Sequence, residues 1–227
     1  MEFKRADLSN CHQAGGTVVV IDVLRAFTTA CYAFAAGVEE IVLASGIEEA
    51  FQLRDRLPDA RIVGEQGGLP VEGFDFSNSP SEIKDAPLEG QQLILRTSAG
   101  TKGVLSSRNA ERILVSSLCC AGATARELYK KSPRVVTFVE TGVFPEDNRG
   151  DEDRVCADYI QSLLLDESLD NATILSRVKN SVAAQPFMDL NKPDFPLSDL
   201  ELSLKINAFD FVLEVKNKQG LLLINSL

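Results

Sequence analysis

The alternation of apolar runs with amphipathic segments constrains the fold of this chain more than any other feature. TVVVIDV (17–23) is a continuous apolar run rich in β-branched residues, which is typical of a strand buried on both faces. Apolar residues then recur at helical spacing as far as Gly37, which predicts a helix that ends at that glycine. A buried strand followed at once by a helix is the beginning of a βαβ unit.

The same alternation recurs along the chain. It predicts strands over residues 39–44, 61–65, 91–97, 112–117 and 134–140, and helices over residues 46–57, from about 100, 120–131, 150–165 and 170–182. This order predicts an α/β fold, a three-layer α/β/α arrangement with a mostly parallel sheet. FDFVLEV (209–215) and GLLLI (220–224) predict a C-terminal β-hairpin, so we expect the sheet to be mixed.

Composition narrows the class of protein. Hydrophobic residues make up 44% and charged residues 25% of the 227 residues, as in ordinary globular proteins, and no linker-like segment divides residues 1–227, so we expect one domain. A net charge of −10 disfavours nucleic acid as a partner, because phosphate backbones bind concentrated basic surfaces. The sequence has no apolar run of membrane-spanning length and no apolar segment of a signal peptide, so we expect a cytoplasmic protein with no membrane partner. A homodimer is expected only from the general frequency of dimers.

Cysteine and histidine usage restricts the chemistry further. The five cysteines are odd in number and contain no C-x-x-C motif, which favours reduced thiols over disulfides or a zinc site. His12 is the only histidine, and this excludes a histidine-rich metal site.

Polar residues follow several of the predicted strands. In open α/β sheets, ligands bind beyond the carboxyl ends of the strands, near helix N-termini. The first strand ends in Asp22 with Arg25, the third in Glu65, the fourth in residues 97–101 (TSAGT) and the sixth in Glu140 with Thr141 and Gly142. We therefore expect these groups to meet at one edge of the sheet. Asp22 is expected at that edge, because an unpaired carboxylate in the core would be costly.

Each of these features has a structural interpretation as well. Asp22 could accept hydrogen bonds from its own helix, and residues 97–101 could form an ordinary capped turn. The long loop 66–82 carries Asn78 and Ser79 and is typical of a functional loop, although its Phe residues could simply attach it to the surface. Ser79 followed by Pro80 could start a short helix.

The acidic segment DEDRVCADY (151–159) starts a predicted helix. Asp151, Glu152 and Asp153 there suit the helix dipole. Three adjacent carboxylates nevertheless repel one another unless a cation or basic groups neutralise them. Mg²⁺, which binds a few carboxylate oxygens together with water and substrate phosphate, fits acids that come from several loops, and the scarcity of histidine favours it over zinc.

Four motifs together resemble one known family. VVVIDVLRAFTT, GEQGGLPVEGFDFSNSP, RTSAGTKG and DEDRVCADY, in this order, resemble the 2-phosphosulfolactate phosphatases, Mg²⁺-dependent enzymes of coenzyme M biosynthesis. The resemblance is strong from Thr17 to Tyr159 and looser thereafter. Where the family usually reads Thr-Thr-Asn-Gly-Thr, this chain has Ala99 in place of the asparagine, and Phe27 replaces a usual small hydroxyl residue.

The resemblance implies an active site and a reaction. The expected reaction is Mg²⁺-assisted hydrolysis of a small anionic phosphate monoester, 2-phosphosulfolactate or a close analogue, to the 2-hydroxy acid and phosphate. The expected catalytic residues are Asp22, Arg25 and Glu65, and the expected metal ligands are Asp22, Glu65, Glu152 and Asp153. The residues expected to bind substrate and phosphate are Asn78, Ser79, Thr97, Ser98, Gly100 and Thr101.

Two other hypotheses remain open at this stage. Cys120 and Arg126 satisfy the C-x₅-R spacing of cysteine phosphatases, although the usual preceding histidine is missing. The Ala99 departure also keeps open a protein that binds an anionic metabolite without hydrolysing it. The aspartyl-phosphate mechanism is disfavoured, because Leu24 stands where its second acid is needed.

Overall fold

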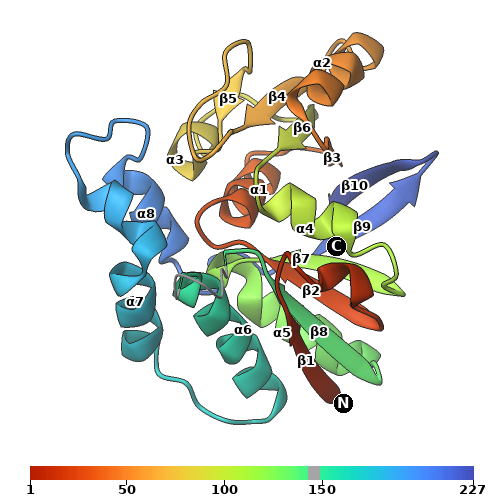
Figure 1. Ribbon diagram of the computed structural model, residues 1–227, viewed down its shortest axis with the longest axis vertical. Coiled ribbons are helices and arrows are strands. Elements are labelled where there is room, and N and C mark those ends of the chain that lie inside the picture. Colours follow the sequence, from red (N-terminus) through yellow and green to blue (C-terminus); the bar gives the residue numbers. More distant parts are fainter. Residues whose placement is uncertain (143–148) are drawn as a thin grey trace.

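The fold is a mixed β-sheet flanked by helices (Figure 1). The structure is a computed structural model of residues 1–227, and it describes residues 1–142 and 149–227. The strands are β1 (Glu2–Ala6), β2 (Thr17–Ile21), β3 (Glu40–Leu43), β4 (Arg61–Gly64), β5 (Phe76–Ser77), β6 (Gln92–Arg96), β7 (Arg112–Ser116), β8 (Val135–Glu140), β9 (Leu213–Lys218) and β10 (Leu221–Ser226).

Helices connect and cover these strands. The α-helices are α1 (Ala26–Ala35), α2 (Ile47–Arg56), α3 (Pro80–Ile83), α4 (Gly100–Ser106), α5 (Ala121–Lys131), α6 (Asp151–Leu164), α7 (Asn171–Asn180) and α8 (Leu197–Ser203). Three short 3₁₀ helices are η1 (Cys11–Gln13), η2 (Leu118–Cys120) and η3 (Val182–Met188). The predicted helices are confirmed within one or two residues of their ends. None of the helices described is long and apolar enough to cross a membrane.

The sheet consists of two parallel blocks joined by the C-terminal hairpin. Its strand order is β1-β8-β2-β7-β9-β10-β3-β6-β4-β5. All neighbours are parallel within the first block (β1, β8, β2, β7) and within the second block (β3, β6, β4, β5). The pairings β7–β9, β9–β10 and β10–β3 are antiparallel. The predicted mixed sheet and hairpin are confirmed, and the hairpin lies in the middle of the sheet.

The two blocks run in opposite directions, because three successive antiparallel pairings separate β7 from β3. In a flat sheet their carboxyl ends would lie at opposite edges. Here Arg25, which follows β2, donates a 2.9 Å hydrogen bond to the carbonyl of Gly68, which follows β4. Figure 1 shows the second block above the first, with α1 and α4 between them. The polar strand ends therefore meet between two facing blocks, whereas the sequence predicted that they meet at one edge of the sheet.

The core lies on both faces of β2. Its residues Val18 and Val20 pack in a hydrophobic cluster with α1, whereas Val19 and Ile21 pack in a second cluster with α5 and α6. All four side chains are fully buried. This alternation is what a β-branched run without a polar face requires, and it fixes the position of Asp22 at the end of the strand.

Candidate active site

Asp22 lies where β2 ends and α1 is about to begin. Its side chain is almost fully buried, and its Oδ1 accepts a 3.0 Å hydrogen bond from the main-chain N–H of Ala26. Its Oδ2 lies 2.8 Å from the position that a Cβ on Gly100 would take. Because Gly100 follows β6, this contact brings an acid of the first block against a loop of the second. The helix-capping interpretation of Asp22 therefore holds alongside a place at the junction of the blocks.

Glu152 and Asp153 approach the same point from the N-terminus of α6. Asp153 accepts hydrogen bonds from the N–H groups of Val23 (2.8 Å) and Gly142 (2.7 Å), so it connects α6 to the ends of β2 and β8. A Cβ on Gly142 would lie 2.6 Å from Glu152 Oε1 and 3.1 Å from Asp153 Oδ2. The two carboxylates thus both lie where a side chain at position 142 would otherwise be.

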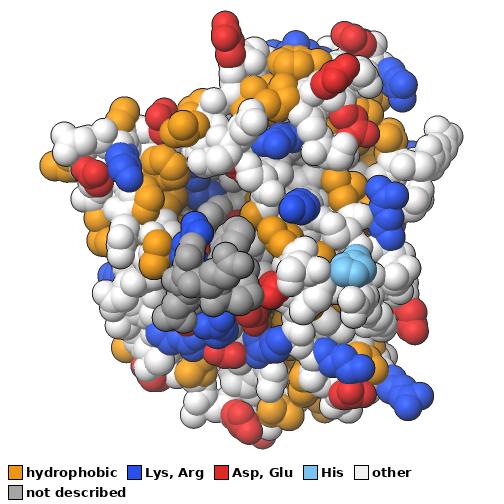
Figure 2. Space-filling model, viewed as in Figure 1, with side chains coloured by type: hydrophobic (Ala, Val, Ile, Leu, Met, Phe, Trp, Pro, Cys, Tyr) orange, Lys and Arg blue, Asp and Glu red, His pale blue; other side chains and the backbone are white. Residues whose placement is uncertain are grey.

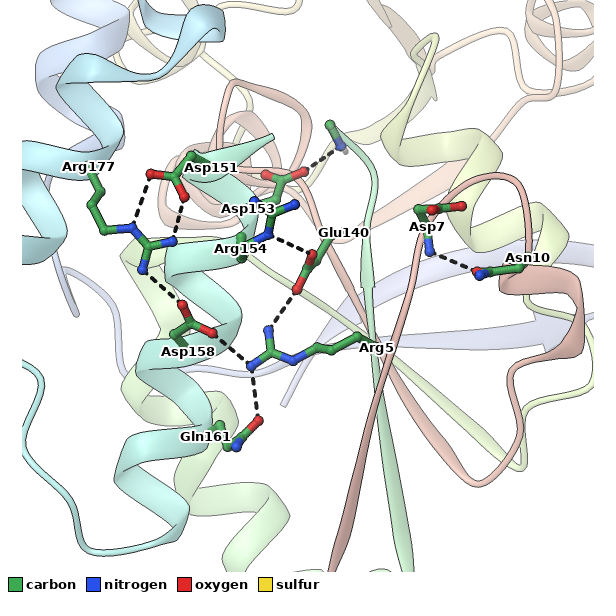
Figure 3. Close-up of polar contacts among 11 residues, drawn as sticks. Arg5, Asp7, Asn10, Glu140, Asp151, Asp153, Arg154, Asp158, Gln161 and Arg177 are labelled. Atoms are coloured by element: carbon green, nitrogen blue, oxygen red, sulfur yellow. Dashed lines mark hydrogen bonds and ion pairs between the residues drawn. The ribbon is translucent and has the colours of Figure 1, made fainter. Parts of the chain in front are cut away.

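The neighbouring acids point elsewhere (Figure 3). Asp151 pairs with Arg177, whose Nε lies 3.0 Å from its Oδ2. Glu140, at the end of β8, pairs with Arg5 at 2.7 Å and lies 3.8 Å from Arg154. The acidic helix start is therefore divided: Asp151 joins a surface ion-pair network, whereas Asp153 faces the end of β2.

The second block supplies Glu65 and residues 97–101 to the site. Glu65 Oε2 accepts hydrogen bonds from the N–H of Gly68 (2.6 Å) and the hydroxyl of Ser98 (3.1 Å), and its Oε1 accepts one from the N–H of Ser98. Thr97 and Thr101 are bound reciprocally, since the main-chain N–H of each donates to the hydroxyl of the other at 3.0 Å. These contacts fix the shape of the loop and use the threonine hydroxyls within it.

Arg25 is held inside the molecule by protein groups. Its guanidinium donates to Asp199 Oδ2 (2.8 Å), the carbonyl of Asp194 (3.1 Å) and the carbonyl of Gly68 (2.9 Å). Within the described residues these bonds occupy three of the five N–H groups that a guanidinium carries. The face shown in Figure 2 is hollowed between the part that carries α8 and the part that carries α1 and α4, and Lys or Arg side chains are visible in this hollow.

Asn78 and Ser79 lie at the end of the long loop. Ser79 caps α3, because its hydroxyl accepts a bond from the N–H of Glu82, and the same hydroxyl donates to Asp199 at 2.7 Å. The short helix after Ser79 is thereby confirmed. Asn78 is 4% exposed, and its Oδ1 has no hydrogen-bond partner among the residues that the structure describes. The side chain of Asn78 is therefore available to a ligand in a way that the Ser79 hydroxyl is not.

Burial raises the pKa of three carboxyl groups at this junction. The pKa of Asp22 rises to about 7, mainly through burial and further through the charges of Glu65 and Glu152. Burial also raises the pKa of Asp153 well above its usual range, and the charges of Glu152 and Asp22 add to the effect. The pKa of Glu152 is raised by burial and by the charge of Asp151. Such mutual repulsion is relieved by protonation or by a neighbouring positive charge.

These residues fit a hard cation in their donor chemistry. Glu152 Oε2 is buried and has no hydrogen-bond partner within residues 1–142 and 149–227, and a bound cation would satisfy this carboxylate oxygen. In those same residues, no three acidic, histidine or cysteine side chains form a ready-made metal cage. Mg²⁺ does not need one, because it keeps several waters and is often held by one or two carboxylates.

The geometry does not favour the cysteine phosphatase. The Cys120 thiol is fully buried, and its hydrogen bond to Cys31 lowers its pKa to about 7. The Arg126 side chain is 63% exposed and pairs with Asp210 at 2.8 Å on the surface. A thiol inside the core and a guanidinium in solvent do not form a common phosphate site.

Sequence reasoning missed three residues that shape the site: Asp199, Phe187 and Phe195, which surround Arg25. They lie in a segment with no pattern beyond a short helix and scattered prolines, so no local signal indicated them. Thr141, a strand-end residue that the sequence did indicate, follows β8 and donates its hydroxyl to the carbonyl of Ile21 at 3.0 Å.

Comparison with known proteins gives a consistent result. The family described as 2-phosphosulpholactate phosphatase matches residues 3–218. The chain is 34% identical to a protein of Bacillus subtilis named probable 2-phosphosulfolactate phosphatase, over 87% of this chain and 86% of that protein. It is 35% identical to a protein of the same name from Carboxydothermus hydrogenoformans, over 92% of this chain and 90% of that protein.

Proposed function

Because the chain belongs to the 2-phosphosulpholactate phosphatase family, a family of phosphoric monoester hydrolases, we propose that it hydrolyses a small phosphate monoester with a second anionic group in the presence of Mg²⁺. The proposed substrate is 2-phosphosulfolactate or a close analogue, and the products are the 2-hydroxy acid and phosphate. With 2-phosphosulfolactate as substrate, the reaction belongs to coenzyme M biosynthesis.

The position of Asp22, Glu152 and Asp153 at the junction of the two blocks, with Glu65 in the facing loop, is the observation that supports this proposal. The charges of Glu65 and Glu152 both raise the pKa of Asp22, so the acids of the two blocks act on one another. A phosphate dianion cannot bind beside them unless a cation compensates the charge. The orphan oxygen of Glu152 gives that cation a ligand.

The side chains can be given separate tasks. Asp22 and Glu152 would hold Mg²⁺, which when bound neutralises phosphate charge and lowers the pKa of a bound water. Asp153, which accepts two main-chain hydrogen bonds, keeps α6 against the end of β2. Glu65, fixed by Gly68 and Ser98, would accept the proton of the attacking water.

The remaining groups would bind the substrate. Arg25 has N–H groups left for phosphate oxygens. The side-chain amide N–H groups of Asn78 would donate to the second anionic group, since its Oδ1 can only accept. In the loop 97–101, the main-chain N–H groups of Ala99 and Gly100 would bind phosphate, because those of Thr97, Ser98 and Thr101 already donate within the protein. Ser98 links this loop to Glu65.

Phosphate release from a panel of small monoesters tests the proposal. We expect turnover with Mg²⁺, none with EDTA, and a loss of about 100-fold or more in kcat for Asp22→Asn. Asp151→Asn is the matched control, because this acid lies on the same helix as Glu152 but binds Arg177. Binding of the esters without any turnover would instead support a non-catalytic binder of anionic metabolites.

The same assay separates the two phosphatase mechanisms. Cys120→Ser should retain the activity of the unaltered protein, because the thiol is buried in the core, where it lies 3.6 Å from the hydroxyl of Ser116. Abolished activity in a folded Cys120→Ser variant, together with normal activity in EDTA, would replace the carboxylate mechanism with the thiolate mechanism.

A further inference from the structure

A buried ion pair joins the active site to the C-terminal part of the chain. Asp199, on α8, is fully buried, and its Oδ2 lies 2.8 Å from Arg25 Nη1. The rings of Phe187 and Phe195 lie 5.2 and 5.0 Å from the guanidinium carbon, within the range of cation–π contacts. Arg25 is thus enclosed by groups from a segment that precedes and includes α8.

The other oxygen of Asp199 is fixed as firmly as the first. Asp199 Oδ1 accepts hydrogen bonds from the hydroxyl of Ser79 (2.7 Å) and from the hydroxyl and N–H of Ser81 (2.6 and 3.0 Å). The carboxylate cannot turn without breaking these bonds in a buried setting, where unsatisfied polar groups are costly. Asp199 therefore connects α8, the start of α3 and the turn before α1.

Through Arg25, the fixed position of Asp199 also constrains the carboxylate of Glu65 in the second block. Arg25 Nη2 donates to the carbonyl of Gly68, whose own N–H donates to Glu65 Oε2 at 2.6 Å. Its Nε–H and the second N–H of Nη2 have no hydrogen-bond partner among the residues that the structure describes. The orientation of these two donors depends on the contacts that hold the rest of the guanidinium.

We propose that Asp199 is a positioning residue, which fixes the guanidinium of Arg25 so that its remaining N–H groups face the phosphate group of the substrate. This inference rests on the proposed function, because it requires a phosphate ester beside Arg25. An ion pair that served only the stability of the fold would leave phosphate affinity unchanged in a folded variant.

A double-mutant cycle on phosphate binding tests this role. In Asp199→Asn, we expect the dissociation constant of inorganic phosphate, measured by calorimetry with Mg²⁺, and the KM of the ester to rise at least tenfold. In the Arg25→Gln background, the same change should alter phosphate affinity less than twofold, because the positioned group is absent. Glu127→Gln is the matched control, since it breaks a 2.8 Å ion pair with Arg112 that lies between α5 and β7. This control should bind phosphate like the unaltered protein.

Several results would overturn the inference. A folded Asp199→Asn variant with unaltered phosphate affinity would do so, as would an equal weakening with and without Arg25. If Asp199→Asn does not fold, Ser81→Ala removes one hydroxyl from the carboxylate without changing charge, and we expect phosphate to bind two- to fivefold more weakly. Unaltered affinity in Ser81→Ala would then contradict the role of Asp199. If the protein binds phosphate but hydrolyses no ester, the proposed function is refuted. The double-mutant cycle on phosphate binding still tests the role of Asp199 in that case.

Discussion

Gly100 determines how closely the loop of the second block approaches Asp22. Asp22 Oδ2 and Ala26 Cβ lie 2.8 and 2.7 Å from the position of a Cβ on Gly100, and the Phe27 ring lies 3.3 Å from it. Contacts below 3.0 Å require a neighbour to move, and here two of the neighbours form the turn that carries the carboxylate. Gly100 is therefore needed for its lack of a side chain.

Gly100→Ala should lower kcat/KM at least tenfold, because the added Cβ displaces Asp22 or the loop 97–101. Overpacking of this kind also destabilises proteins by about 1–3 kcal/mol. Gly15→Ala is the control, since apart from its chain neighbours no atom of the described residues lies within 4 Å of its Cβ position, and it should keep full activity. Steady-state kinetics with Mg²⁺ on both folded variants measures the difference, and an unaltered kcat/KM in Gly100→Ala would show that the close approach is not needed.

At this scale the sequence indicated the acids but not their partners. Asp22 and Glu65 follow buried strands, and Asp153 starts a helix, so local pattern and family motifs both selected them. Asp199 lies 174 residues from Arg25 in the chain, within LSDLELSLKI, which predicts only a short helix. An ion pair between such distant residues is determined by tertiary packing and leaves no local signal.

At the scale of elements, buried carboxylates join α6 to the end of β2. Asp153 receives a main-chain hydrogen bond from Val23, and Asp22 lies next to Val23 in the chain. The pKa of Asp22 is raised to about 7, chiefly by burial. An acid whose pKa is higher in the folded than in the unfolded state binds protons more tightly when folded, so it stabilises the fold at low pH.

The stability of the metal-free protein should therefore fall as pH rises from the unfolded pKa of Asp22 through its folded pKa. Between pH 6 and pH 8, we expect this residue to lower the free energy of unfolding by about 1 kcal/mol. Urea unfolding in EDTA measures the change, and Asp22→Asn should abolish the part that is due to this residue. Mg²⁺ should stabilise the protein more at pH 8 than at pH 6. An identical pH dependence in Asp22→Asn would contradict the raised pKa.

The elements that sequence reasoning found are those with strong periodicity. The buried strands and the longer helices lie where their apolar patterns predict them, as β2 and α5 illustrate. Two edge strands were missed: β1 (EFKRA) is largely exposed and carries no apolar run, and β5 has only two residues. Pairing with β8 and β4 forms these strands, and neither sequence has a strong preference of its own.

At the scale of the whole molecule, the position of the C-terminal hairpin creates the site. By pairing with β7 on one side and β3 on the other, β9 and β10 reverse the second block relative to the first. The two blocks do not lie flat in one plane, so their polar loops meet, as the hydrogen bond from Arg25 to the carbonyl of Gly68 shows. The hairpin itself could be predicted from its apolar runs, but its partners could not, because they lie about 100 to 180 residues away in the chain.

The most direct test of this account is a crystal structure with Mn²⁺, which replaces Mg²⁺, and inorganic phosphate, with the metal located by anomalous scattering. The predicted result is a manganese ion bound to Asp22 and Glu152, with the phosphate between that ion and Arg25. Metal and phosphate bound together at a place remote from these three residues would contradict the account.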